Sequence, residues 1–186
     1  MKLNVGSGIK RFDGFLNVDS DPRSNPDYVV KLGKEPLPFE DNSVDEVIAH
    51  HILEHLAGDD FFQFIKELYR VCKHTAIIDV VVPHPRHDYF FGDLTHYRPI
   101  TIENMRQLSK KYCDNSSFIN TSWSGYANVL NVDFDIFHYE YEFDETFKQV
   151  YADADIDRVN WLARALNNAI SEIKFKMMVI KDEQSS

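Results

Sequence analysis

Short apolar runs, broken by turn residues, dominate the first half of the chain. Each run is bounded by Gly, Asp, Asn or Pro and contains β-branched residues. Runs of four to eight such residues are typical of strands buried inside a sheet. The runs that we expect to form strands are 2–5, 14–18, 27–30, 44–49 and 75–82.

Helical spacing lies between and after these runs. Apolar positions at 59–72 recur every three or four residues, which predicts a helix with Asp59 as its N-cap. The same spacing predicts further helices over 101–112 and 156–173. A closing strand is expected at 174–180, before a polar tail.

Strands that alternate with helices predict an α/β fold with a doubly wound, mostly parallel sheet, whose ligand crevice lies at the carboxyl ends of the strands. The length of 186 residues fits a single domain over 1–186, with a lid or insertion within about 83–151. Aromatic and polar residues alternate over 137–144, the period of a half-buried strand. That strand is either an edge strand with a solvated face or an aromatic, acidic wall that contacts a substrate.

Composition narrows the possible partners. The chain has 20 Lys and Arg against 30 Asp and Glu, a net charge of -10 that repels nucleic-acid phosphates. No apolar run approaches the roughly 20 residues that span a bilayer, and the N-terminal residues do not resemble a secretory signal. We therefore expect a cytoplasmic protein without a membrane or nucleic-acid partner. The two cysteines, Cys72 and Cys113, suggest neither a disulfide framework nor a thiolate zinc site.

The end of the first strand carries Gly6-Ser7-Gly8, where missing side chains let backbone amides approach a ligand. A dinucleotide fingerprint would need a third glycine at position 11, which is Arg11. Asp19 ends the next strand, and its two oxygens can accept both hydroxyls of a ribose. The alternative is that Asp19 only forms a turn with the residues after it.

Histidines follow the fourth strand. The segment from His51 to His55 spells H-x-x-E-H, the inverted zinc-peptidase pattern, with Glu54 in its fourth position. Gly58 leaves little room for the helix that this pattern requires, and the sequence indicates no third ligand. We therefore expect no metal site here, and His51 is either a catalytic residue beside the crevice or a packed histidine.

A loop rich in histidine, aromatic residues and proline follows the strand at 75–82. Loops at this edge of an α/β sheet often carry binding residues. His96 has Asp93 before it and Arg98 after it. It is expected on the side of the crevice where the acceptor substrate would bind, and a histidine there can take a proton from that substrate near neutral pH. Hydrogen bonds within the loop and helix capping are the alternative roles.

Five segments together resemble the class I S-adenosylmethionine-dependent methyltransferases of the methyltransferase type 11-like kind. The resemblance covers about residues 2–110. It implies a seven-stranded, Rossmann-like sheet whose last strand is antiparallel, and S-adenosylmethionine as the cofactor. The segments that carry the resemblance are 3–8, 14–19, 37–45, 52–56 and 67–71.

The resemblance also assigns roles to single residues. The methionyl end of the cofactor is expected at the glycine loop, the ribose at Asp19, the adenine near the end of the third strand, and the methyl group near the end of the fourth. The cofactor-binding residues expected on this basis are Gly6, Ser7, Gly8, Asp19, Lys31, Leu32 and His50.

Two departures from the family pattern stand out. Only eleven positions separate Gly8 from Asp19, which predicts a shortened first helix, and Lys31 stands where the family often has an acid. The expected function is methyl transfer to a small-molecule acceptor by in-line displacement, with His51 and His96 as catalytic residues. The alternatives are a domain that binds the cofactor without catalysis and an H-x-x-E-H zinc hydrolase.

Overall fold

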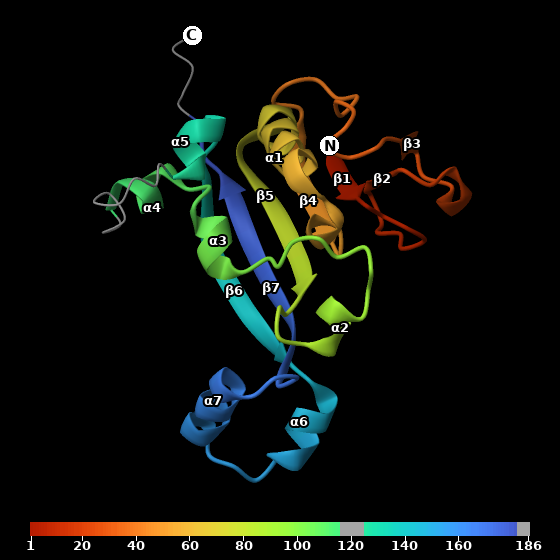
Figure 1. Cartoon of the computed structure of the whole chain (residues 1–186). Coiled ribbons are helices and arrows are strands. Elements are labelled where there is room, and N and C mark those ends of the chain that lie inside the picture. The colour runs from red at the N-terminus through yellow and green to blue at the C-terminus, as the bar shows by residue number, and fades with distance from the viewer. Residues whose placement is uncertain (116–124, 182–186) are drawn as a thin grey trace.

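A computed structural model describes residues 1–115 and 125–181 (Figure 1). Its centre is a seven-stranded sheet in the order β3-β2-β1-β4-β5-β7-β6. Strand β7 runs antiparallel to β5 and β6, whereas the pairs among β1 to β5 are parallel. This confirms the predicted fold class. The strands are β1 Lys2–Val5, β2 Leu16–Asp19, β3 Tyr28–Val29, β4 Val44–His50, β5 Cys72–Pro83, β6 Phe134–Phe143 and β7 Ile170–Val179.

The helices are mostly short. The longest described helix, α1, places its apolar stripe of five buried residues against the sheet. Its N-cap is Ala57, so the prediction of Asp59 as the cap was wrong; Asp59 and Asp60 lie in the first turn, where their negative charges stabilise the positive end of the helix dipole. Among the described residues no helix is long and apolar enough to span a membrane. The α-helices are α1 Gly58–Val71, α2 Asp88–Phe91, α3 Ile102–Arg106, α4 Lys110–Asn115, α5 Tyr126–Leu130, α6 Glu145–Val150 and α7 Ile156–Ala165, and single 3-10 turns cover Pro22–Ser24 and Leu53–His55.

Two predicted helices have different bounds. The helix expected over 101–112 is divided into α3 and α4, because the Asp133 carboxylate accepts the backbone N–H of Lys110 at 2.9 Å and starts a new helix there. The helix expected over 156–173 ends at Ala165. Residues from Ile170 onward pair with β6, and from Glu172 also with β5, because their apolar positions also fit the two-residue period of a strand.

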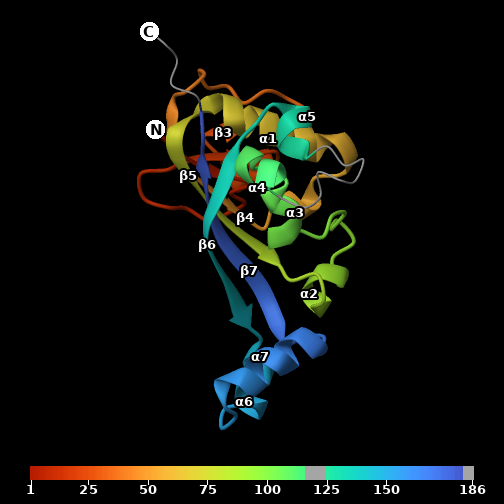
Figure 2. The same cartoon turned by 90° about the vertical axis from the view of Figure 1, so that its left-hand side faces the viewer.

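The two faces of the sheet differ in their cover. Helices α1, α3, α4 and α5 lie on one side of the sheet, which we call the covered face (Figure 2). The other side, the open face, has no helix on it in the described structure: β1 and β2 are joined by turns alone, so the predicted shortened first helix is reduced to a loop. This loop crosses the open face near β1, where its Lys10 carbonyl accepts a hydrogen bond from Asn4.

Strand β6 lies at the edge of the sheet. An edge strand with a solvated face was one of the two interpretations of the alternating pattern at 137–144. The side chains of residues 137–141, which point alternately to the two faces of the sheet, are all exposed. Between β6 and β7 the chain forms an arm of α6 and α7 beyond the end of the sheet (Figure 1). The arm has a small core of its own around Phe147 and Ala163. It begins inside the range 83–151 predicted for an insertion and continues past it to the start of β7 at Ile170.

Candidate functional site

The glycine loop leaves β1 at the carboxyl edge of the sheet. Gly6 and Gly8 both have positive φ angles, +62° and +49°. A Cβ atom on Gly6 would lie 2.6 Å from the Ile52 side chain, whereas one on Gly8 would have no atom within 4 Å. Gly6 is therefore required by packing, and the backbone of Gly8 faces open space where a ligand can approach it.

Asp19 holds this loop in place. Its Oδ2 atom accepts the backbone N–H of Gly8 at 2.7 Å, and its Oδ1 atom accepts that of Asp21 at 2.8 Å. The buried Ser7 donates its backbone N–H to Val18, so the loop is fastened to β2 at a second point. Asp19 is thus a turn residue, and each of its carboxylate oxygens keeps a second lone pair for a further donor.

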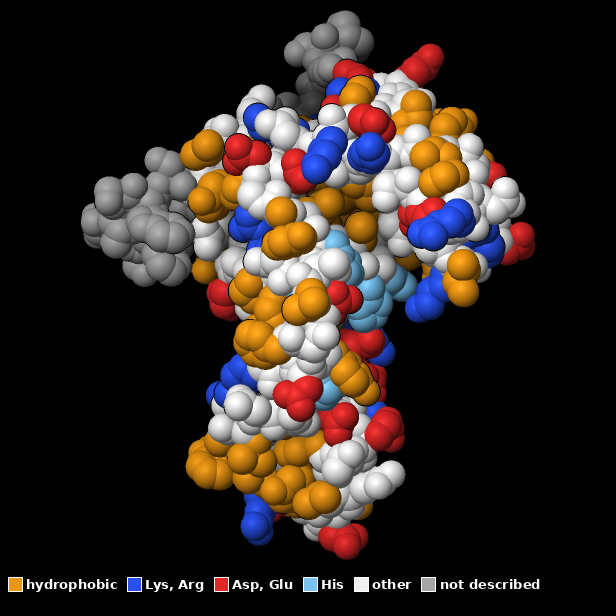
Figure 3. Space-filling view, turned by 45° about the vertical axis from the view of Figure 1, so that its right-hand side comes forward, with side chains coloured by type: hydrophobic (Ala, Val, Ile, Leu, Met, Phe, Trp, Pro, Cys, Tyr) orange, Lys and Arg blue, Asp and Glu red, His pale blue; other side chains and the backbone are white. Residues whose placement is uncertain are grey.

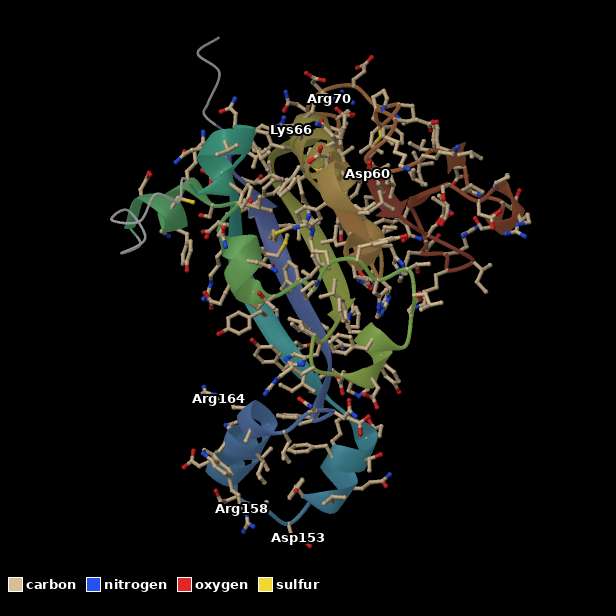
Figure 4. The ribbon with its side chains drawn as sticks, in the orientation of Figure 1. Asp60, Lys66, Arg70, Asp153, Arg158 and Arg164 are labelled. Atoms are coloured by element: carbon tan, nitrogen blue, oxygen red, sulfur yellow. The ribbon has the colours of Figure 1, made fainter. Side chains whose placement is uncertain are left out.

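Lys31 and Leu32 form the turn after β3. The backbone N–H of Lys31 donates to Glu35 Oε2 at 2.9 Å, and the Lys31 carbonyl accepts two backbone hydrogen bonds. Leu32 is buried, whereas the Lys31 side chain is exposed. An ion pair of 3.7 Å between Lys34 and Asp60 links this turn to the start of α1 (Figure 4).

His50 ends β4 and lies on the open face, because its neighbour Ala49 faces the core. Its Nε2 atom is 2.8 Å from Asp79 Oδ1, and Lys176 lies 3.3 Å from the other oxygen of Asp79. These side chains line a groove of about 370 Å³ on the open face, together with Lys10 and His51.

His51 turns the chain out of β4 with a left-handed φ angle of 54°. Its Nδ1 atom lies 3.5 Å from Glu54 Oε1 and its Nε2 atom 3.1 Å from Glu172 Oε1. The nearby Glu54 carboxylate raises the pKa of His51, against an opposing contribution from burial. The two carboxylates therefore favour the protonated imidazolium.

Glu54 is the most buried charged residue of the region, with an exposed fraction of 0%. Neither of its carboxylate oxygens has a hydrogen-bond partner in the described structure. Its backbone carbonyl accepts the N–H of Tyr97 at 2.9 Å, which holds the loop after β5 against the end of β4. As a result His96 stacks edge-on against His55, with ring centroids 4.6 Å apart.

The H-x-x-E-H segment does not form the helix of a zinc peptidase. Residues Leu53–His55 make a single 3-10 turn, and α1 begins only at Gly58. His51 and His55 therefore do not lie on successive turns of one α-helix, as that pattern requires. The zinc-hydrolase alternative loses its structural basis.

The structure thus joins predicted residues in two groups. Gly6, Ser7, Gly8 and Asp19 meet at the ends of β1 and β2, and His51 and His96 both lie close to the Glu54 carboxylate. Histidine side chains gather near the middle of the molecule, above the narrower part that leads to the arm (Figure 3). A binding role for Glu54 could not be predicted from the sequence, because no local pattern reveals that 54–55 and 96 are in contact.

Residues 14–78 match the methyltransferase domain family. The matched region contains Asp19 and the end of β4 and begins after the glycine loop. No curated protein matches the chain. Among solved structures, similar folds are found in an S-adenosylmethionine-dependent methyltransferase from Archaeoglobus fulgidus (19% identity, 95% of this chain and 85% of that chain, TM-score 0.62) and another from Methanosarcina mazei (12%, 97% and 92%, 0.59).

A third similar structure is phosphoethanolamine N-methyltransferase 2 from Haemonchus contortus, which was solved in complex with S-adenosyl-L-methionine (14% identity, TM-score 0.54). The alignment covers 97% of this chain and 48% of that one. At these identities the likeness concerns the fold. The chain has the class I S-adenosylmethionine-dependent methyltransferase fold, and the family resemblance seen in its sequence is confirmed. The cofactor expected from the sequence is the one these methyltransferases use.

Proposed function

We propose that the protein transfers a methyl group from S-adenosylmethionine to a small-molecule acceptor. The observation that carries this proposal is the junction of the glycine loop with Asp19, at the carboxyl ends of β1 and β2 in a sheet with the class I order. Ligands of open α/β sheets bind at this edge. S-adenosylmethionine, when bound, supplies an electrophilic methyl group on its sulfonium.

The residues around the junction fit such a ligand. The open space beside Gly8 can take the methionyl end, and the spare lone pairs of Asp19 can accept the ribose hydroxyls. Lys31 and Leu32 are the proposed adenine neighbours; the Lys31 side chain is exposed, whereas Leu32 is buried in the core. His50, at the end of β4, is proposed to lie near the methyl group of the cofactor, and its ring nitrogen is engaged with Asp79.

The acceptor side is proposed at the exit of β4, where His51 stands. Glu54 and Glu172 stabilise the protonated form of His51, which makes its neutral form a stronger base for a hydroxyl acceptor. His96 is the second proposed catalytic residue, and one of its ring nitrogens lies within 4.8 Å of a Glu54 carboxylate oxygen. A protein of this kind mainly has to align nucleophile, carbon and sulfur.

Binding of S-adenosylhomocysteine tests the cofactor site. A ligand at a hundredfold excess over its Kd stabilises the native state by about 2.7 kcal/mol, which raises the melting temperature by several degrees. Asp19→Ala is expected to weaken binding by about 1.5 to 3 kcal/mol in calorimetry. Asp13→Ala, an exposed acid in the same loop, is the matched control and is expected to bind normally.

Because Asp19 also holds two backbone amides, the melting temperature of unliganded Asp19→Ala must be measured beside its affinity. An unchanged melting curve of the wild type at millimolar ligand, with no heat of binding, would refute the cofactor site. Equal affinity of Asp19→Ala and wild type would restrict Asp19 to its role in the turn.

Turnover separates an enzyme from a domain that only binds the cofactor. Wild-type protein is incubated with methyl-labelled S-adenosylmethionine and panels of hydroxyl, amine and carboxylate compounds, and label is sought in the small-molecule fraction. His51→Ala is expected to keep its cofactor affinity within about twofold and to lose roughly 10²-fold in turnover. Binding without any labelled product across the panels would favour the non-catalytic alternative.

A further inference from the structure

Two segments that are far apart in the sequence bring three side chains of metal-binding types close together. Glu54 and His55 come from the 3-10 turn after β4, and His96 comes from the loop after β5. One donor atom from each of the three lies within 4.8 Å of the other two. Two imidazoles and one carboxylate are a ligand set of zinc and related divalent transition metals.

The burial of Glu54 is an independent sign that a cation belongs here. Its carboxylate is fully buried, and both oxygens lack a hydrogen-bond partner in the described chain. A buried charge without compensation is costly, so buried carboxylates are normally paired or bind a metal. The sole ion-pair contact described for this carboxylate is His51 at 3.5 Å, which is too long for a good hydrogen bond.

Neighbouring groups hold the two histidines in the metal-binding tautomer. The Thr95 hydroxyl donates its proton to Asp93, so it accepts the hydrogen bond from His55 Nδ1 at 2.9 Å. The Phe90 carbonyl can only accept, so His96 Nδ1 donates to it at 2.8 Å. In both neutral rings the proton is thus on Nδ1, and the lone pair is on Nε2. Hydrogen bonds of this kind orient the histidine ligands of metal sites.

Although the H-x-x-E-H pattern by itself predicts no metal site, we propose that Glu54, His55 and His96 bind one divalent transition-metal ion, with zinc as the first choice. Ligand atoms about 2.1 Å from one tetrahedrally coordinated zinc ion lie about 3.4 Å apart, so donors within 4.8 Å of one another must close by as much as about 1.4 Å. Three protein ligands leave a fourth position for water or a substrate atom. Asp93, whose Oδ2 is 3.8 Å from His96 Nε2, lies beside that position.

The proposed metal site does not require that the protein transfers methyl groups, but it changes the role that the proposed function gives to His96. With a metal bound, His96 acts as a ligand, and His51 is left as the residue for proton transfer. The metal also joins the loop after β5 to the end of β4, two segments that otherwise meet through hydrogen bonds to the Glu54 carbonyl and the contacts of His55.

The test is metal binding by the full chain without a histidine tag. Protein treated with a chelator and dialysed is titrated with Zn²⁺ in competition with a chromophoric chelator, and the Co²⁺ complex is followed by its visible absorption. We expect one ion per chain. His96→Ala and Glu54→Gln are each expected to weaken Zn²⁺ binding at least about 100-fold, whereas His138→Ala, an exposed histidine on β6, is expected to bind as wild type.

Thr95→Val examines the positioning of His55 without removing a ligand. We expect a loss of about 10- to 100-fold in affinity and a changed Co²⁺ spectrum, because the second nitrogen of His55 loses its acceptor. Circular dichroism and melting curves establish that each variant is folded. If His96→Ala does not fold, Glu54→Gln and the wild-type stoichiometry decide the matter. Folded wild type that binds no Zn²⁺ at tens of micromolar, or that loses as much affinity with His138→Ala as with Glu54→Gln, would overturn the proposal.

Discussion

The two faces of the sheet are built from alternate residues of the same strands, yet their chemistry is opposite. On β7 the covered face carries Phe175 and Met177, which are almost fully buried. The residues between and beside them, Lys174 and Lys176, lie on the open face and pair with acids there. A sheet with helices on both faces would need apolar residues at both sets of positions.

The open face is therefore stable without a helical layer because its side chains are solvated and paired. Ion pairs between neighbouring strands extend this pattern across the sheet. Lys2 on β1 pairs with Glu46 on β4, and Lys176 on β7 pairs with Asp79 on β5. A class I sheet order can thus be kept while a layer of helices is reduced to loops. Most of the stability is expected to come from the covered face, which the following substitutions test.

The largest effect is expected from Phe175→Ala. Phe175 is 1% exposed and lies in the main core, so its removal leaves a cavity and should lower the free energy of unfolding by about 3 to 5 kcal/mol. Lys176→Ala, the next residue on the open face, should change it by less than about 1 kcal/mol. Denaturant unfolding of both variants measures the difference. Equal losses would mean that the open face is covered in solution.

An intermediate effect is expected from Arg70→Ala at the end of α1. Arg70 forms a bidentate pair with Glu67 and donates to the carbonyls of Leu37 and Phe39, which fastens the connector after β3 to the helix layer. Loss of these bonds should cost about 1 to 3 kcal/mol. Lys66→Ala is the control, an exposed residue on the same helix that should cost less than about 0.5 kcal/mol (Figure 4). Similar melting temperatures for the two variants would show that the hydrogen bonds of Arg70 do not stabilise the fold.

The smallest effect is expected from Asp79→Asn on the open face. The hydrogen bond from His50, followed by that from Lys176, lowers the pKa of Asp79. The contribution of the Asp79 carboxylate to the free energy of unfolding is therefore fully present above the pKa of this group in the unfolded chain, about 3.9. It is lost as the pH falls through the lower pKa that Asp79 has in the folded state. At pH 7 we expect a loss of less than about 1 kcal/mol, which shrinks at high salt and in acid. A difference from wild type that stayed constant down to pH 2 would contradict this assignment.

Local sequence determined much of this protein. The strand positions, helix α1 and the positive-φ glycines after β1 follow from periodicity and turn residues, because these depend on neighbours along the chain. The position of Asp19 at the end of β2, opposite the glycine loop, also follows from strand ends that meet at one edge of a parallel sheet.

Tertiary structure decided the rest. Apolar spacing at 170–173 fits a helix or a strand equally well, and pairing with β6 and β5 selected the strand. A doubly wound sheet predicts helices on both faces with a shortened first helix, and in the structure the connection between β1 and β2 is a loop without a helix. The meeting of His96 with Glu54 and His55 depends on how the loop after β5 crosses the end of β4. Such contacts join residues far apart in the chain, so they are fixed by the packing of the whole sheet and not by any local pattern.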